Sequence, residues 1–311
     1  MSALPESPSA ASDAAPMAVA PRSLWRQLLR HNGVVAGGFV LIVVILIALA
    51  APFLGTTDPA AINPSMRNKM PGTEISSRLD DGSKVTHNAL MGTDSLGRDI
   101  YSRVLYGSRV SLIVGVAVAA IAIAIGLFIG MIAGYVRWLD GIVMRMMDGL
   151  MAIPAILLAI ALVSLWGAGL ATVIFAIVVP EVPRVVRLVR AVVLSIREEP
   201  YVEAAIASGT RTPRILMFHV LPNTIAPLIV QATYICASAI LIEAILSFLG
   251  IGIPSDIPTW GNIMAEGRQF FRLYPHNIFF PGIFLALTVL AVNIMGDGLR
   301  DTLDPRMAKR F

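Results

Sequence analysis

Long stretches of the chain contain no charged side chain. Five blocks lack Asp, Glu, Lys and Arg throughout, namely residues 31–57, 110–136, 149–180, 215–242 and 273–296. A helix needs about 20 apolar residues to cross the hydrocarbon core of a bilayer, and every block is longer than that. The pattern predicts a polytopic α-helical membrane protein and excludes a soluble enzyme, a nucleic-acid-binding domain and a disordered chain.

The block 149–180 is too long for one crossing and too short for two complete ones. Residues 166–169 read Trp-Gly-Ala-Gly and supply a turn in its middle. Two helices fit if the first begins near Ile142 and the second continues through Val186. We therefore expect an all-α fold with six transmembrane helices. The other four are expected at residues 34–54, 110–135, 224–249 and 278–296.

Composition agrees with a membrane location, since 56% of the 311 residues are hydrophobic and only 14% are charged. Basic residues are concentrated in four segments, 22–30, 136–145, 184–214 and 300–310. The positive-inside rule therefore places both ends of the chain in the cytoplasm. The net charge of +4 is attributed to these basic segments and not to a nucleic-acid partner.

The chain divides into segments by composition. Residues 1–21, rich in Ala, Ser and Pro, are expected to be a disordered cytoplasmic tail. The first apolar run exceeds the roughly 7–15 residues of a signal peptide, so we expect it to stay as a helix. The expected segments after the tail are 22–54 with the first helix, an extracytoplasmic loop at 55–108, a five-helix core at 109–300 and a cytoplasmic tail at 301–311.

The cytoplasmic loop at 195–222 carries the most informative pattern. The Glu-Ala-Ala run at 203–205 favours helix, and Gly209 permits a left-handed helix cap. Pro213 suits the first turn of a second short helix with Thr212 as its N-cap. We expect a helix–turn–helix on the membrane face whose small residues let a partner approach closely.

The spacing within this loop resembles the EAA loop of ABC importer permeases. In that family the loop docks into a groove of the ATP-binding subunit and transmits its motion. The resemblance implies a type I importer transmembrane-domain fold. The residues that carry the match, and hence the implied coupling role, are Glu203, Ala204, Ala205, Gly209, Leu221 and Pro222.

Other segments are similar to one subfamily, the C-type permeases of dipeptide, oligopeptide, nickel, glutathione and opine importers. The matching segments are 92–99, 246–250 and 293–306, and the resemblance covers about residues 22–306. It implies a multi-pass protein of a bacterial inner (plasma) membrane. The implied partners are a second, B-type permease subunit, two ATP-binding subunits, a periplasmic or lipoprotein substrate-binding protein and membrane lipid.

The chain itself is expected to be non-enzymatic. It contains no G-x-x-x-x-G-K-[ST] phosphate loop, so ATP hydrolysis is assigned to the partner subunits. The single Cys236 and four widely separated histidines predict no metal site, and we expect no cofactor. The alternative is a secondary transporter driven by an ion gradient, which would call for inverted repeats that the sequence does not show.

Two acidic residues lie within predicted helices, where a carboxylate is by default a functional candidate. Three roles are open to Glu243: it lines the pathway, pairs with an arginine of the partner permease, or hydrogen-bonds within the bundle. We favour a structural or gating role over substrate recognition. Glu181, flanked by Pro180 and Pro183, is expected in a kinked, locally unwound segment, where it pairs with Arg184 or faces the pore.

Glycines recur every four residues late in the second predicted helix. Gly126, Gly130 and Gly134 form a doubled small-x-x-x-small pattern. Such a pattern predicts close packing against another helix. The sequence leaves open whether that helix belongs to this chain or to the partner permease.

Overall fold

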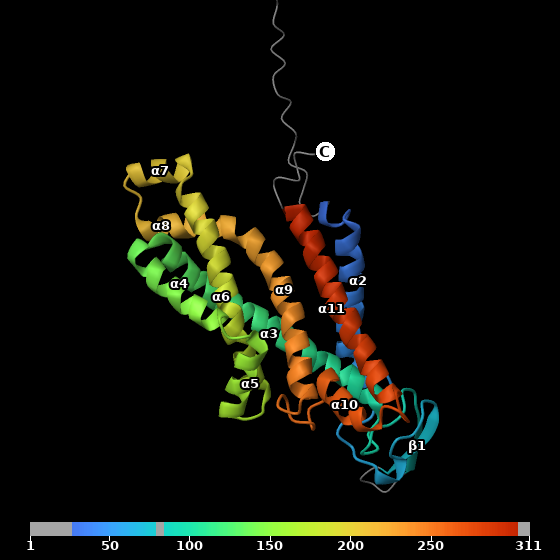
Figure 1. Ribbon diagram of the computed structural model, residues 1–311. Coiled ribbons are helices and arrows are strands. Elements are labelled where there is room, and N and C mark those ends of the chain that lie inside the picture. The colour runs from blue at the N-terminus through green and yellow to red at the C-terminus, as the bar shows by residue number, and fades with distance from the viewer. Residues whose placement is uncertain (1–26, 79–83, 304–311) are drawn as a thin grey trace, which may run out of the picture.

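A computed structural model describes residues 27–78 and 84–303 (Figure 1). The tail expected at 1–21 and most of the one expected at 301–311 lie outside the described residues. The main elements are α2 (Asn32–Ala50), β1 (Thr73–Arg78), β2 (Lys84–Ala89), α3 (Ile100–Tyr135), α4 (Arg137–Met151), α5 (Ala155–Trp166), α6 (Leu170–Arg197), α7 (Pro200–Ala207), α8 (Thr212–Ile215), α9 (Leu221–Phe248), α10 (Trp260–Gly267) and α11 (His276–Leu303). Short turns of helix lie at Ala51–Phe53, Pro64–Met66, Leu216–Val220 and Arg268–Phe270.

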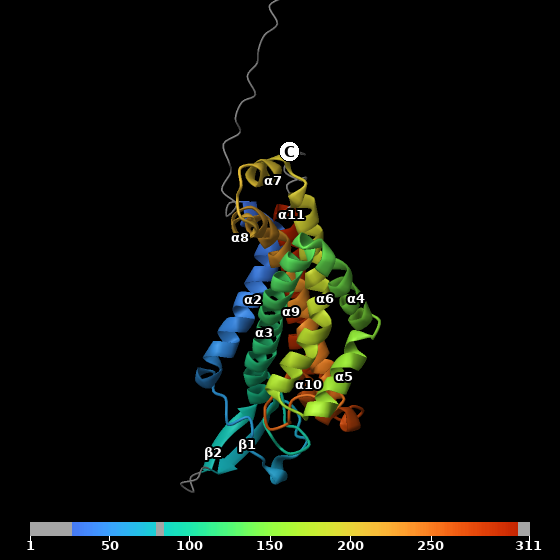
Figure 2. The same cartoon turned by 90° about the vertical axis from the view of Figure 1, so that its left-hand side faces the viewer.

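The chain runs back and forth between two ends of an elongated bundle (Figures 1 and 2). We call them the α7 end, which carries α7 and α8, and the hairpin end, which carries β1, β2 and α10. The start of α2 and the end of α11 both lie at the α7 end. Their proximity is marked by His31 Nε2, which lies 3.6 Å from Asp301 Oδ2. Both described ends of the chain are thus on the side of the loop at 195–222.

Within residues 27–78 and 84–303, four helical segments are long and apolar enough to cross a membrane, namely Asn32–Phe53, Ile100–Tyr135, Thr212–Phe248 and His276–Leu303. The pair α4 and α5 makes a fifth candidate, although the two helices are bent by 86° at their junction. The helix α6 has sufficient length, but Glu181, Arg184 and Arg187 interrupt its apolar sequence. The sixth crossing therefore remains a prediction.

Two sequence expectations about the loop at 55–108 were wrong. The helix α3 begins at Ile100, inside the expected loop, because Asp99 caps it by accepting the Ser102 backbone N–H. The expected all-α fold also omits the antiparallel hairpin of β1 and β2, in which Thr73 pairs with Ala89. The polar, turn-rich sequence of this region concealed both features.

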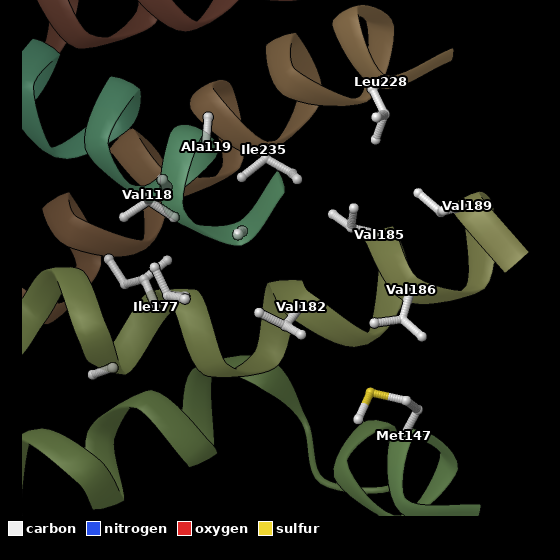
Figure 3. Packing of buried hydrophobic residues seen from close by; sticks show 14 of the residues in the cluster. Val118, Ala119, Met147, Ile177, Val182, Val185, Val186, Val189, Leu228 and Ile235 are labelled. Carbon is white, nitrogen blue, oxygen red and sulfur yellow. The ribbon is translucent and has the colours of Figure 1, made fainter. Parts of the chain in front are cut away.

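The core lies between α3, α6 and α9. Figure 3 shows Val185 and Val189 on one side of α6, and Val186 on the opposite side toward Met147 of α4. The glycines of α3 face the first side, because an added Cβ at Gly130 would lie 2.7 Å from the Val189 Cβ. The predicted close packing is therefore confirmed, and its partner is α6 of this same chain.

Candidate functional site

The loop at 195–222 folds as a helix–turn–helix, as the sequence predicts. The helix α7 ends in a left-handed Gly209 with φ of +77°. The Thr210 N–H donates to the Ala205 carbonyl at 3.0 Å and the Gly209 N–H to the Ile206 carbonyl at 2.9 Å. This hydrogen-bond pair is the Schellman arrangement, which glycine adopts without steric cost. The second helix begins at Thr212, so Arg211 and not Thr212 is its N-cap.

Buried side chains attach this segment to the rest of the bundle. Val202 of α7, together with Ile215 and Val220, belongs to the core shared with α3 and α6. The Tyr201 ring stacks on the His219 ring, with 6.1 Å between the centroids. These contacts join α7 to α6 and to the turn of helix at Leu216–Val220 that precedes α9.

The opposite surface of the segment is open. Glu203 and Ala204 are exposed on α7, and Ala205 is partly buried. Large apolar side chains of the same segment are exposed as well, including Ile206 at 46% and Phe218 at 71%. Leu221 and Pro222 form the first turn of α9 and fix the exit of the chain from the segment. Apolar side chains exposed together are typical of sites that contact another protein or a membrane.

Glu243 of α9 is fully buried within the chain. The Ser247 hydroxyl donates to its Oε1 at 2.7 Å and accepts the Ile253 backbone N–H at 3.3 Å. The Ser247 hydroxyl thus links the Glu243 carboxylate to the segment that leads into α10. Gly261 of α10 lies directly on this part of α9, because an added Cβ would come 2.7 Å from the Ala244 Cα.

Glu181 is buried in the middle of α6. Arg184 Nη1 donates to its Oε1 at 3.2 Å and its Oε2 at 3.3 Å, which confirms the predicted pairing. The Ser238 hydroxyl of α9 donates to the same Oε1 at 3.2 Å. The expected unwinding was wrong, because α6 remains helical through Pro180 and Pro183.

The structure does not bring the two carboxylates to a common point. Glu181 contacts α9 at Ser238, and Glu243 lies five residues further along that helix. Five residues rotate a side chain by about 140° around the helix axis and advance it by about 7.5 Å. The two glutamates therefore face different surroundings.

The sequence of this chain matches known transport proteins. Residues 122–309 match the family described as "Binding-protein-dependent transport system inner membrane component". Residues 22–71 match "N-terminal TM domain of oligopeptide transport permease C". The chain belongs to this permease family.

Its similarity to individual permeases extends over nearly the whole length. It is 53% identical over 281 residues to the "Probable peptide ABC transporter permease protein y4tQ" of Sinorhizobium fredii, covering 90% of this chain and 91% of that one. It is 42% identical to the "Dipeptide transport system permease protein DppC" of Alkalihalophilus pseudofirmus, covering 93% and 91%. It is 38% identical to the "Glutathione transport system permease protein GsiD" of Pectobacterium atrosepticum, covering 92% and 91%.

A buried charge cluster at the hairpin end of this permease was missed by sequence reasoning. Arg98 Nε lies 2.7 Å from Asp94 Oδ2, and Arg98 Nη2 also pairs with Glu266 of α10. Arg103 Nη2 lies 3.5 Å from Glu266 Oε1. Burial raises the pKa of Glu266, and the two guanidinium groups oppose that rise. The two acids and two bases connect the loop at 55–99 to α10 with no net charge.

The signal for this cluster was weak in the sequence. Asp94 and Arg98 stand four apart in the segment 92–99, which was recognised only as a family signature. Their partner Glu266 is far away along the chain, in a segment with no predicted element. A second contact strengthens the same junction, since Trp260 of α10 is buried and its Nε1 donates to the Val104 carbonyl at 3.2 Å.

Proposed function

We propose that this chain is the membrane-spanning permease subunit of an ATP-driven importer, forming half of the pathway for peptides or related small solutes. The observation that carries the proposal is the family match together with the exposed helix–turn–helix at the α7 end. Relatives named for peptide, dipeptide and glutathione transport support the solute class. The comparisons give no support to the alternative of a secondary transporter.

The proposed topology has six crossings, with α6 as the fourth and the α7 end in the cytoplasm of a bacterial inner membrane. Basic residues concentrated at 22–30, 136–145, 197–214 and 300–310, outside the middle of α6, support the orientation. The hairpin end, with β1, β2 and α10, then faces the external binding protein. In this arrangement both ends of the chain are cytoplasmic.

The proposed coupling element is the α7–α8 segment, which docks on an ATP-binding subunit. Glu203 and Ala204 would contact the partner directly, while Ala205 and Gly209 shape the surface through the helix cap. Leu221 and Pro222 would pass motion into α9 because they form its first turn. The complex would contain a second permease, two ATP-binding subunits and an external binding protein.

We assign gating roles to the two buried glutamates. Glu243 would position the Ser247 hydroxyl, which holds the segment before α10 against α9 at the outer mouth of the pathway. Glu181 would hold α6 to α9 near the middle of the bilayer through Ser238. Each carboxylate has at least one hydrogen-bond donor, Ser247 for Glu243 and Arg184 with Ser238 for Glu181, as expected for an ionisable group that a membrane protein retains in its interior.

Reconstitution of the complex tests the proposal. The chain is co-expressed with the second permease and the two ATP-binding subunits and placed in proteoliposomes. The binding protein should stimulate ATP hydrolysis, and the chain alone should hydrolyse no ATP. An ATPase activity that does not respond to the binding protein in a complete, correctly assembled complex would contradict the proposal.

A further inference from the structure

Arg184 is a half-exposed cation midway along α6. It lies between Leu170 and Arg197, about 20 Å from each end of the helix. Its side chain is 48% exposed on the surface of this chain. A charged side chain at such depth is costly unless it faces water, an ion partner or another subunit. The exposed guanidinium therefore calls for a specific neighbour.

The next two arginines on this face of α6 differ from Arg184 in one respect. Arg187 Nη2 lies 2.8 Å from Asp148 of α4, and Arg190 pairs with Asp140 of the same helix. Each of them bridges α6 to α4. Arg184 instead pairs with Glu181, which lies one turn earlier on its own helix. Among the described residues, it thus adds no hydrogen bond or ion pair between α6 and α4.

The pairing uses only one of the nitrogen atoms of Arg184. Nη1 donates to both oxygens of Glu181. Within the described part of the chain, Nε and Nη2 donate no hydrogen bond. The Ser238 hydroxyl also donates to the buried Glu181 carboxylate. The position of the carboxylate is therefore fixed, and so is that of the guanidinium that pairs with it. A guanidinium edge with two N–H groups matches the two oxygens of a carboxylate.

We propose that Arg184 binds an anionic group of the passing solute, which in a peptide is a carboxylate. The inference rests on the proposed function, because it needs α6 to border the translocation pathway. Glu181 is a positioning residue here, since it orients the guanidinium and partly offsets its charge. A contact of this kind holds the solute weakly enough to release it, as a pathway requires.

A reporter cysteine one turn from Arg184 tests the local charge. Leu188 is partly exposed and lies four residues further along α6, on a neighbouring part of the same face. In a Cys236→Ala background, Leu188→Cys is treated within the assembled complex with anionic sulfonatoethyl methanethiosulfonate or cationic trimethylammonioethyl methanethiosulfonate. The ratio of the anionic to the cationic reaction rate should be about threefold or more higher with arginine at position 184 than with Arg184→Gln.

Arg184→Lys is the matched variant, because it keeps the charge and should keep most of the rate ratio. Equal ratios for the arginine and glutamine forms would overturn the inference. So would a cysteine at position 188 that reacts in the isolated chain but is protected in the complex, because the partner permease would then cover this face. A complex whose ATPase responds to the binding protein but shows no anion preference overturns this inference alone. If the ATPase of the complete complex does not respond to the binding protein, the proposed function is contradicted as well.

Discussion

Gly130 of α3 lies so close to Val189 of α6 that even a single added carbon has no room. A Cβ at Gly130 would come 2.7 Å from the Val189 Cβ and 2.9 Å from the Val186 carbonyl oxygen. The backbone carbonyl cannot move aside as a flexible side chain would. The two helices are thus in contact at the distance that glycine alone permits, which is how small residues promote helix packing in membranes.

Gly130→Leu should therefore separate α3 from α6. We expect a loss of about 1–3 kcal/mol, the usual cost of forcing extra carbon into a packed core, and a lower unfolding temperature in detergent. The matched control is Gly141→Leu on α4, where no atom of the described residues lies within 4 Å of an added Cβ. Equal unfolding temperatures for Gly130→Leu and the unmodified chain would contradict the packing described here.

The orientation can be tested by chemical labelling. Ala61 at the hairpin end and Ser208 at the α7 end are both exposed. Each is replaced by cysteine in a Cys236→Ala background, and intact cells are treated with a membrane-impermeant thiol reagent. We expect Ala61→Cys to react from outside and Ser208→Cys to react only after the cells are broken. The reverse result would invert the topology.

The charge cluster at the hairpin end should be sensitive to the loss of one acid. Glu266→Gln leaves Asp94 as the remaining acidic partner of Arg98 and Arg103 within the cluster. Removing one partner of a buried ion pair typically costs about 3–5 kcal/mol. We expect the loop at 55–99 to come away from α10 and to be cut faster in limited proteolysis.

Glu74→Gln is the control for this proteolysis experiment, because Glu74 is exposed on the hairpin. Arg98→Gln, added to Glu266→Gln, should increase the rate of proteolysis by less than Arg98→Gln does alone, because Arg98 and Glu266 pair with each other. Strict additivity of the two changes would show that the pair is not coupled.

The sequence predicted those features that depend on local pattern. The apolar blocks placed the long helices, and the glycine at position 209 marked a left-handed cap because few other residues adopt that conformation. The spacing of Gly126, Gly130 and Gly134 indicated a packing face, although the identity of the facing helix came only from the structure.

Features that depend on contacts between residues far apart in the chain could not be predicted from the sequence. The first turns of α3 are polar, and their charges are satisfied by groups far away in the sequence. Arg109, for example, donates to the Leu49 carbonyl at 3.1 Å. A hydropathy pattern therefore reads this part of the helix as loop. The same reasoning explains why Glu266 was not recognised as a partner of Arg98.

The coupling role of the α7–α8 segment leads to the last prediction. Gly209→Val places a β-branched side chain at a φ of +77°. This conformation costs an L-residue about 1–2 kcal/mol, although no atom of the described part of the chain lies within 4 Å of an added Cβ. The penalty should distort the Schellman cap and shift α7. Glu203→Arg should act differently, by reversing the charge at an exposed position of the docking surface.

Both variants should insert into the membrane at normal levels but lose transport and binding-protein-stimulated ATP hydrolysis together. Glu198→Gln is the matched control, because Glu198 is exposed before α7 begins and lies outside the proposed contact. The measurement is reconstitution of the whole complex with equal amounts of each variant. If Gly209→Val and Glu203→Arg both transport at the unmodified rate, motion must reach α9 by another route, and the exposed surface around Ile206 and Phe218 would lose its proposed partner.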